Sequence, residues 1–148
     1  MGIVISLEPH RIKKEWKEEK RLLQDLDVQE VKSTAEKVFT PVFHRFQFPY
    51  TFLEEACVDL ALESFLSGGK YSRYVEGRAL PFTFQVQAAA AVGEIAGELY
   101  EFMQCWVEDD PGCYLKEMKE AVDSFIVYWW KRGLETGVRR QPLDYRKR

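Results

Sequence analysis

Apolar residues recur at alternating steps of three and four along most of this chain. One such series begins at Ala88 and a second begins at Leu115. Their members are Ala88, Val92, Ile95, Leu99, Phe102 and Trp106, and then Leu115, Met118, Val122, Phe125 and Trp129. This spacing places apolar side chains on one face of a helix. The pattern therefore predicts an all-α fold, a compact bundle of about five helices.

Capping residues and helix breakers set the expected boundaries. Asp27 with Glu30, and Thr51 with Glu54, have the spacing of a capping box, in which side chains bind the free amides of the first helical turn. The expected helices cover about 9–25, 27–41, 51–66, 84–108 and 115–132. We expect the third helix to be central in the bundle.

Glycines and prolines indicate where the helices stop. Gly68 and Gly69 are expected to end the third helix with a left-handed cap. The Asp-Pro-Gly sequence within 109–112 predicts a turn, across which the fourth and fifth helices pair antiparallel. Lys131, Arg132 and Gly133 suit the end of the fifth helix, so that residues 135–148 form a loosely ordered basic tail.

The length and the cysteines limit the kind of protein. At 148 residues the chain suits a single domain, residues 1–148, and no apolar stretch approaches the roughly 20 residues of a membrane span. Ile3, Val4 and Ile5 are followed by a charged run, which does not resemble a secretion signal. The cysteines are Cys57, Cys105 and Cys113, without CxxC spacing. We expect a cytoplasmic protein with reduced thiols.

Charge is strongly segregated behind the small net charge of -3. Residues 46–69 and 79–115 contain acids and no Lys, Arg or His, whereas 11–21 and the C-terminal tail are rich in bases. Acids three or four residues apart on a helix repel each other. A compensating positive charge is therefore expected near each acidic stripe: Mg²⁺ or Mn²⁺, basic side chains, or solvent and salt.

Two acidic stripes follow from this pattern. Glu55, Asp59 and Glu63 fall within about 80° on the third helix, which is otherwise apolar around most of its circumference. An acidic seam on a largely buried helix is a candidate site. The ordinary interpretation, a solvated polar face, applies to both stripes.

The second stripe suggests a metal site. Glu98 and Glu101, followed by Glu120 and Asp123, resemble the ExxE, spacer, ExxD arrangement of the all-alpha NTP pyrophosphohydrolases. The resemblance implies that these four carboxylates, with Glu94 as an addition, hold Mg²⁺ for nucleotide hydrolysis. The chain departs from that family at two places. Ile95 stands where the family has a second acid, and Val122 stands where it has a small residue.

Two further features suggest self-association. Gly93 and Gly97, together with nearby alanines, form a small-residue patch where another helix of the chain, or a second copy, can approach closely. The adjacent Trp129 and Trp130 point about 100° apart. Both rings are buried only if their helix packs on two sides or meets a partner chain, so we expect a homodimer.

Two long runs resemble a known family. They are the segment from Leu53 to Lys70, LEEACVDLALESFLSGGK, and the segment from Phe125 to Gly133, FIVYWWKRG. They are similar to the YbaK-type domain of unknown function of spore-forming bacilli, an uncharacterised family. The resemblance implies a bacterial protein and supplies no catalytic residues.

The leading interpretation is a non-enzymatic cytoplasmic interaction or regulatory module that self-associates and has an unidentified protein partner. The alternative is the Mg²⁺-dependent NTP pyrophosphohydrolase using Glu98, Glu101, Glu120 and Asp123. The third is a nucleic-acid binder acting through the basic tail around Tyr145, although a terminal basic run in an acidic protein is more often solvated.

Overall fold

Helices make up most of the part of the chain that can be described. The computed structural model describes residues 19–42, 51–107 and 115–140, with side chains at all of these except 51–52 and 106–107. Residues 19–23 are helical. They are followed by α2 (Val28–Phe39), α3 (Thr51–Tyr71), the 3-10 helix η1 (Ser72–Tyr74), α4 (Phe82–Val107) and α5 (Leu115–Arg139). The predicted all-α bundle is confirmed.

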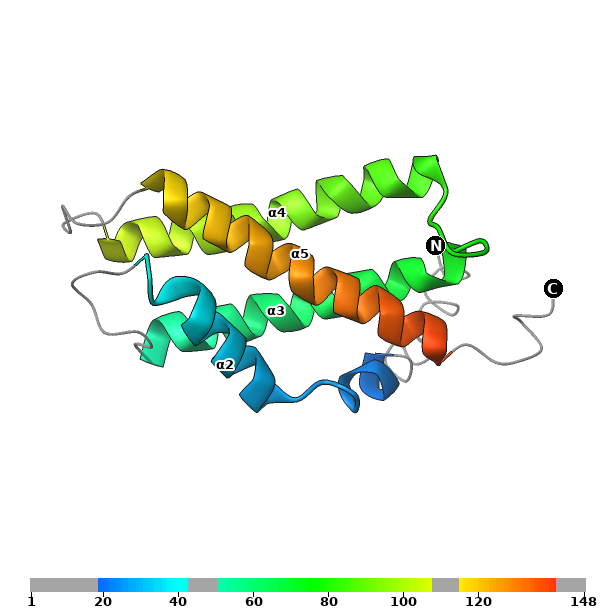
Figure 1. Ribbon diagram of the computed structural model, residues 1–148, viewed down its shortest axis with the longest axis horizontal. Coiled ribbons are helices and arrows are strands. Elements are labelled where there is room, and N and C mark those ends of the chain that lie inside the picture. Colours follow the sequence, from blue (N-terminus) through cyan, green and yellow to red (C-terminus); the bar gives the residue numbers. More distant parts are fainter. Residues whose placement is uncertain (1–18, 43–50, 108–114, 141–148) are drawn as a thin grey trace, which may run out of the picture.

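Helices α3 and α5 lie at the centre of the bundle, and α2 and α4 each pack against both of them. In Figure 1, α4 lies along the top, α3 runs below it in the opposite direction, and α5 crosses diagonally in front. The α3–α5 contact is the most extensive, and α2 packs against both of these helices. Helices α4 and α5 run antiparallel, as the turn between them predicted.

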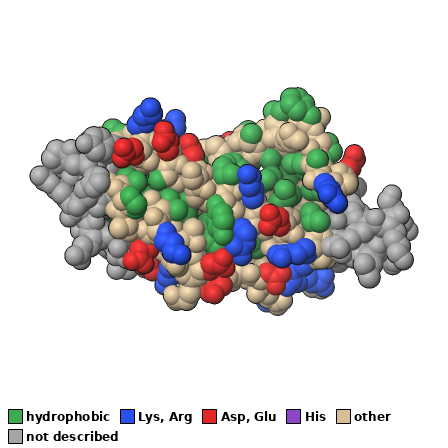
Figure 2. Space-filling view, in the orientation of Figure 1, with side chains coloured by type: hydrophobic (Ala, Val, Ile, Leu, Met, Phe, Trp, Pro, Cys, Tyr) green, Lys and Arg blue, Asp and Glu red, His purple; other side chains and the backbone are tan. Residues whose placement is uncertain are grey.

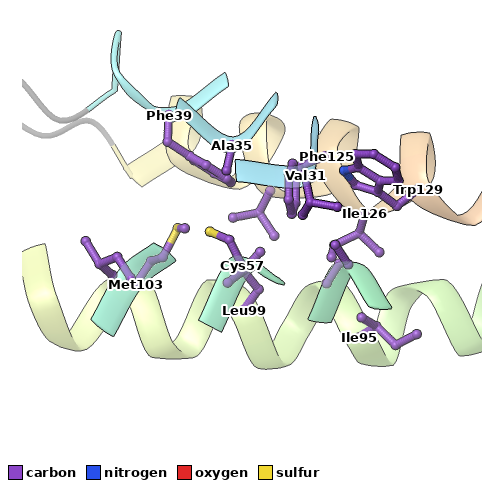
Figure 3. Close-up of a cluster of buried hydrophobic side chains, with 14 of the residues drawn as sticks. Val31, Ala35, Phe39, Cys57, Ile95, Leu99, Met103, Phe125, Ile126 and Trp129 are labelled. Carbon is purple, nitrogen blue, oxygen red and sulfur yellow. The ribbon is translucent and has the colours of Figure 1, made fainter. Parts of the chain in front are cut away.

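Every one of these four helices contributes to the core. Phe39 of α2, Phe65 of α3, Leu99 of α4 and Trp129 of α5 are all at most 1% exposed. Figure 3 shows how side chains from the separate helices point toward one another in this cluster. The three-and-four spacing of the sequence corresponds to this burial, because it aligns the apolar positions of each helix on its inner face.

The start of α2 confirms one half of the predicted capping box. Asp27 is the N-cap residue, and its carboxylate accepts a hydrogen bond of 2.9 Å from the Gln29 amide. Glu30 has a different role. Both of its carboxylate oxygens accept hydrogen bonds from Arg132 of α5, the shorter one 2.8 Å long. The side chain therefore joins two helices.

The predicted ends of α3 and α5 are wrong. Helix α3 continues through Gly68 and Gly69 to Tyr71, and neither glycine has a positive φ angle. Helix α5 continues through Gly133 to Arg139, with Thr136 and Gly137 buried, so the expected tail does not begin at residue 135. Both errors have one cause. A glycine within a helix costs only about 1 kcal/mol, and here a close helix contact offsets that cost.

Several expectations fall on residues outside the described ranges. They are the first half of the helix expected at 9–25, the turn at 109–112, and the basic end of the tail at 141–148.

Candidate functional site

The carboxylates predicted to hold Mg²⁺ lie on two helices and point into solvent. Glu98 and Glu101 are exposed on α4, while Glu120 and Asp123 are exposed on α5. Among the residues that the structure describes, no three His, Cys, Asp or Glu side chains are grouped so that they could hold a metal ion. The four carboxylates therefore do not form the converging set that the resemblance to the pyrophosphohydrolases implies.

The acidic seam of α3 also faces solvent. Glu55, Asp59 and Glu63 are all exposed. Partial burial raises the pKa of the Glu63 carboxyl, and the negative charge of Glu98 on α4 raises it further. The two acidic stripes thus meet at Glu63 and Glu98, where like charges repel each other.

The buried cysteine is poorly suited to nucleophilic chemistry. Cys57 is fully buried in the core, and this burial raises the pKa of its thiol to about 12, with a smaller contribution from the charge of Glu54. A thiol with this pKa is protonated at neutral pH, and only the thiolate is a good nucleophile. Cys57 is therefore a packing residue.

The two tryptophans are accommodated within the chain. Trp129 is fully buried, which removes it from the predicted interface surface. Its neighbour Trp130 is half-buried, and its Nε1 donates a hydrogen bond of 3.3 Å to the Ser67 hydroxyl. Helix α5 packs on several sides, against α2, α3 and α4, so that Trp129 is fully covered and Trp130 is partly covered without a partner chain.

Helices α3 and α5 cross at unusually close range. A Cβ atom on Gly68 would lie 2.0 Å from the backbone oxygen of Trp130, and one on Gly133 would lie 1.9 Å from the backbone oxygen of Phe65. The Ser64 hydroxyl also donates a hydrogen bond of 2.7 Å to the Ile126 carbonyl across the same crossing. No larger residue fits at either glycine unless the helices separate.

One face of α4 carries apolar residues that no other described element covers. Phe82 is 77% exposed and Val86 is 55% exposed. A Cβ atom on Gly93 or Gly97 would meet nothing within 4 Å. The exposed members of this face are Phe82, Val86, Ala89, Ala90, Gly93 and Gly97. They fall within an arc of about 100° and form a continuous stripe, here called the α4 face.

Gly93 and Gly97 thus lie in a small-residue patch, as predicted, and this patch is on the exposed surface of α4. No described helix approaches these glycines closely, so the expectation of an intramolecular close contact is wrong. Phe82 and Val86, at the N-terminal end of the same face, were missed. Their spacing of four residues, with Ala89, Ala90 and Gly93 following, was the signal available in the sequence.

A groove of about 410 Å³ runs beside the α4 face, between α4 and α5. Its lining is mainly apolar and includes Val92, Ala96 and Trp130, with Asp123 and Lys131 as its charged residues. Figure 2 shows hydrophobic side chains gathered here, on the right-hand part of the surface where Figure 1 places α4 and α5. The groove and the α4 face share Ala89 and Gly93, so they form one continuous apolar surface.

None of the helices described here combines the length and the apolar character that a membrane-spanning helix needs.

These features define an all-α bundle whose most distinctive site is an apolar surface that none of the described residues covers. The chain belongs to the family described as "Protein of unknown function (DUF2521)", which it matches over residues 1–146. It is similar to the uncharacterized protein YbaK of Bacillus subtilis (strain 168), with 23% identity over 134 residues, 90% of this chain and 91% of that protein. No solved structure matches the chain. The resemblance expected from the two sequence runs is confirmed.

Proposed function

We propose that this protein is a non-enzymatic interaction module of the cytoplasm, and that it associates with a second copy of itself through the α4 face. The observation that carries the proposal is the exposure of Phe82 and Val86 beside two glycines that nothing described covers. Soluble proteins rarely expose contiguous apolar patches unless the patch binds something.

The energetics favour a helix as the binding partner. Fully burying a Phe or Val side chain is favourable by about 1.5–3 kcal/mol relative to leaving it exposed. Alanine and glycine allow a second helix to approach closely, so that large side chains on the partner can pack against the α4 backbone. In a symmetric dimer both copies bury Phe82 and Val86, so each favourable burial is gained twice.

The experiment measures the oligomeric state by sedimentation velocity over a range of protein concentrations. We expect the wild-type chain to dimerise and Gly93→Glu to remain monomeric, because the new carboxylate lies at the centre of the α4 face. Gly93 has open space around it, so this substitution leaves the fold intact.

The matched control is Gln87→Glu, which adds the same charge to the same helix. Residue 87 is exposed and lies about 120° around the helix from Gly93. This variant should dimerise like the wild type. A wild-type chain that stays monomeric at every concentration, or a Gly93→Glu variant that dimerises normally, contradicts the proposal.

A further inference from the structure

We infer that the groove between α4 and α5 binds one fatty-acid molecule, with the acyl chain along the apolar floor of the groove and the carboxylate beside Lys131. The inference goes beyond the proposed self-association, because it concerns a small molecule and not a second copy of the chain. It follows from the size of the groove, from its lining and from the placement of its charged residues.

The groove has the size and the lining of a small-molecule site. Its volume of about 410 Å³ lies within the range of about 300–1,000 Å³ that is typical of ligand pockets. Gln85, Asp123 and Lys131 are its polar and charged lining residues, and the others are apolar residues or glycine. Such a lining favours a long apolar ligand that carries few polar atoms.

The two charged residues lie toward opposite ends of the groove. Asp123 and Lys131 are both exposed on α5, and the eight residues between their positions correspond to about 12 Å along the helix. Because α4 runs antiparallel to α5, Gln85 lies at the Lys131 end of the groove and Ala96 lies at the Asp123 end. The groove is therefore positive at one end and negative at the other, with apolar side chains between.

An anionic head group fits the positive end. The Lys131 ammonium group attracts a carboxylate, and Gln85 adds a hydrogen-bond donor. Its Nε2 already donates a hydrogen bond of 2.6 Å to the Leu80 carbonyl, and an amide nitrogen carries a second hydrogen that a ligand carboxylate can accept. Asp123 repels an anion from the other end. These charges give the ligand one preferred orientation.

The length of the groove indicates an acyl chain of medium length. A chain that begins at Lys131 and passes Val127 to reach Asp123 covers about 12 Å of α5. Along this path it removes from water both its own surface and that of Val92 and Trp130, which line the groove and are half-buried. Figure 2 shows the hydrophobic side chains gathered in this part of the surface.

Ligand binding and self-association can be tested separately. The groove and the α4 face share Ala89 and Gly93, whereas Phe82 and Val86 do not line the groove. The number of ligand molecules bound per chain can be measured whether or not the chain associates. Either proposal can therefore fail while the other stands.

Isothermal titration calorimetry with dodecanoate, used below the concentration at which it forms micelles, tests the inference. We expect saturable binding of one molecule per chain. Lys131→Glu should weaken this binding by about tenfold, because an attraction at the head group becomes a repulsion. The same variant should bind dodecyltrimethylammonium, which has the same chain length and the opposite charge, more tightly than the wild type does.

The matched control is Lys119→Glu, which makes the same charge change at an exposed position of α5 outside the groove lining. It should leave both affinities unchanged. Val127→Phe should weaken the binding of both ligands, because the larger side chain occupies the floor of the groove. Circular dichroism checks that each variant keeps the helical fold.

The results separate a fatty-acid site from other uses of this surface. Absence of saturable dodecanoate binding would overturn the inference, and so would an affinity that Lys131→Glu leaves unchanged. Association with phosphatidylglycerol vesicles, without binding of free dodecanoate, would also overturn it, since the apolar surface would then contact a lipid bilayer. Saturable binding whose preference for the anionic ligand reverses in Lys131→Glu supports the inference.

Discussion

The chain contains two glycine pairs with the same four-residue spacing, and the fold treats them in opposite ways. On α5, a Cβ atom at Gly133 would lie 1.9 Å from the Phe65 backbone oxygen, and one at Gly137 would lie 2.3 Å from the Ser72 hydroxyl. On α4, Gly93 and Gly97 have open space around them. The same local pattern thus forms the tightest helix crossing in one place and an uncovered surface in the other.

The difference lies in what each pair faces. Gly133 meets α3 close to a glycine of α3, Gly68, which faces Trp130 of α5, so both backbones can approach. The Ser64 hydroxyl adds a hydrogen bond to the Ile126 carbonyl at this crossing. No such complementary surface within the described chain faces Gly93 and Gly97. A small-residue pair is therefore a contact site only where a matching surface reaches it.

The largest expected effect comes from filling the α3–α5 crossing. Gly133→Ala should lower the free energy of unfolding by about 3 kcal/mol or more, because the added methyl group overlaps the Phe65 backbone and forces the helices apart. Urea denaturation followed by circular dichroism measures this value. An unchanged or increased stability would show that α3 and α5 are farther apart at Gly133 than in this structure.

The same substitution on α4 should have the opposite sign. Gly93→Ala and Gly97→Ala should each raise the free energy of unfolding by about 0.5–1 kcal/mol, because alanine has the higher helix propensity and nothing stands in its way. The measurement uses protein dilute enough to be monomeric, since association would add its own stabilisation. A destabilised variant would mean that the α4 face is covered in the monomer.

A smaller effect should come from the ion pair at the end of α5. Arg140 binds Asp25, and this hydrogen bond holds the pKa of the Asp25 carboxyl below its ordinary value. The pair therefore stabilises the fold above the ordinary pKa of an aspartate, near 3.9, and that stabilisation is lost as the pH falls below it. Because both side chains are about a third exposed or more, we expect less than about 1 kcal/mol.

Asp25→Asn should accordingly be slightly less stable than the wild type at pH 7 and equally stable at pH 2, as measured by urea denaturation. Asp59→Asn is the matched control, because it makes the same substitution at an exposed position of α3 that forms no ion pair with another described residue. If the loss at pH 7 exceeds that of Gly133→Ala, the polar end of α5 rather than the glycine crossing holds this helix in place.

The smallest expected effect concerns the acids of α4. Because Glu98, Glu101, Glu120 and Asp123 do not form a metal-binding group in the described structure, millimolar Mg²⁺ or Mn²⁺, with or without nucleoside triphosphates, should leave the melting temperature unchanged. A saturable increase that is lost in Glu98→Ala/Asp123→Ala would instead support the pyrophosphohydrolase alternative.

The helices were predictable because their signals are local. The apolar spacing of α4 and α5 and the N-cap of α2 lie within a few residues of the structure that they specify. The family was likewise evident from two short runs. The small residues of the α4 face were also identified, although the exposure of Phe82 was not, because an apolar residue at the start of a helix fits a core position equally well.

The errors all concern contacts between distant segments. Gly68 and Gly133 are ordinary helix-ending signals until α3 and α5 are brought together, as is Gly69 until Leu22 packs against it. Glu30 is an ordinary capping residue until Arg132, 102 positions later, reaches it. The Trp129 and Trp130 pair was similarly ambiguous. Whether a partner chain was needed depended on how many helices surround α5.

The sequence by itself determined that the chain is helical, where most helices lie and which residues are small, acidic or aromatic, because backbone propensity and periodicity act over one or two turns. The tertiary structure alone decided which glycine pair is buried and which is exposed. That choice depends on whether a complementary surface from a distant segment reaches the glycines. It made the α3–α5 crossing the centre of the fold, and it left the α4 face uncovered by the residues that the structure describes.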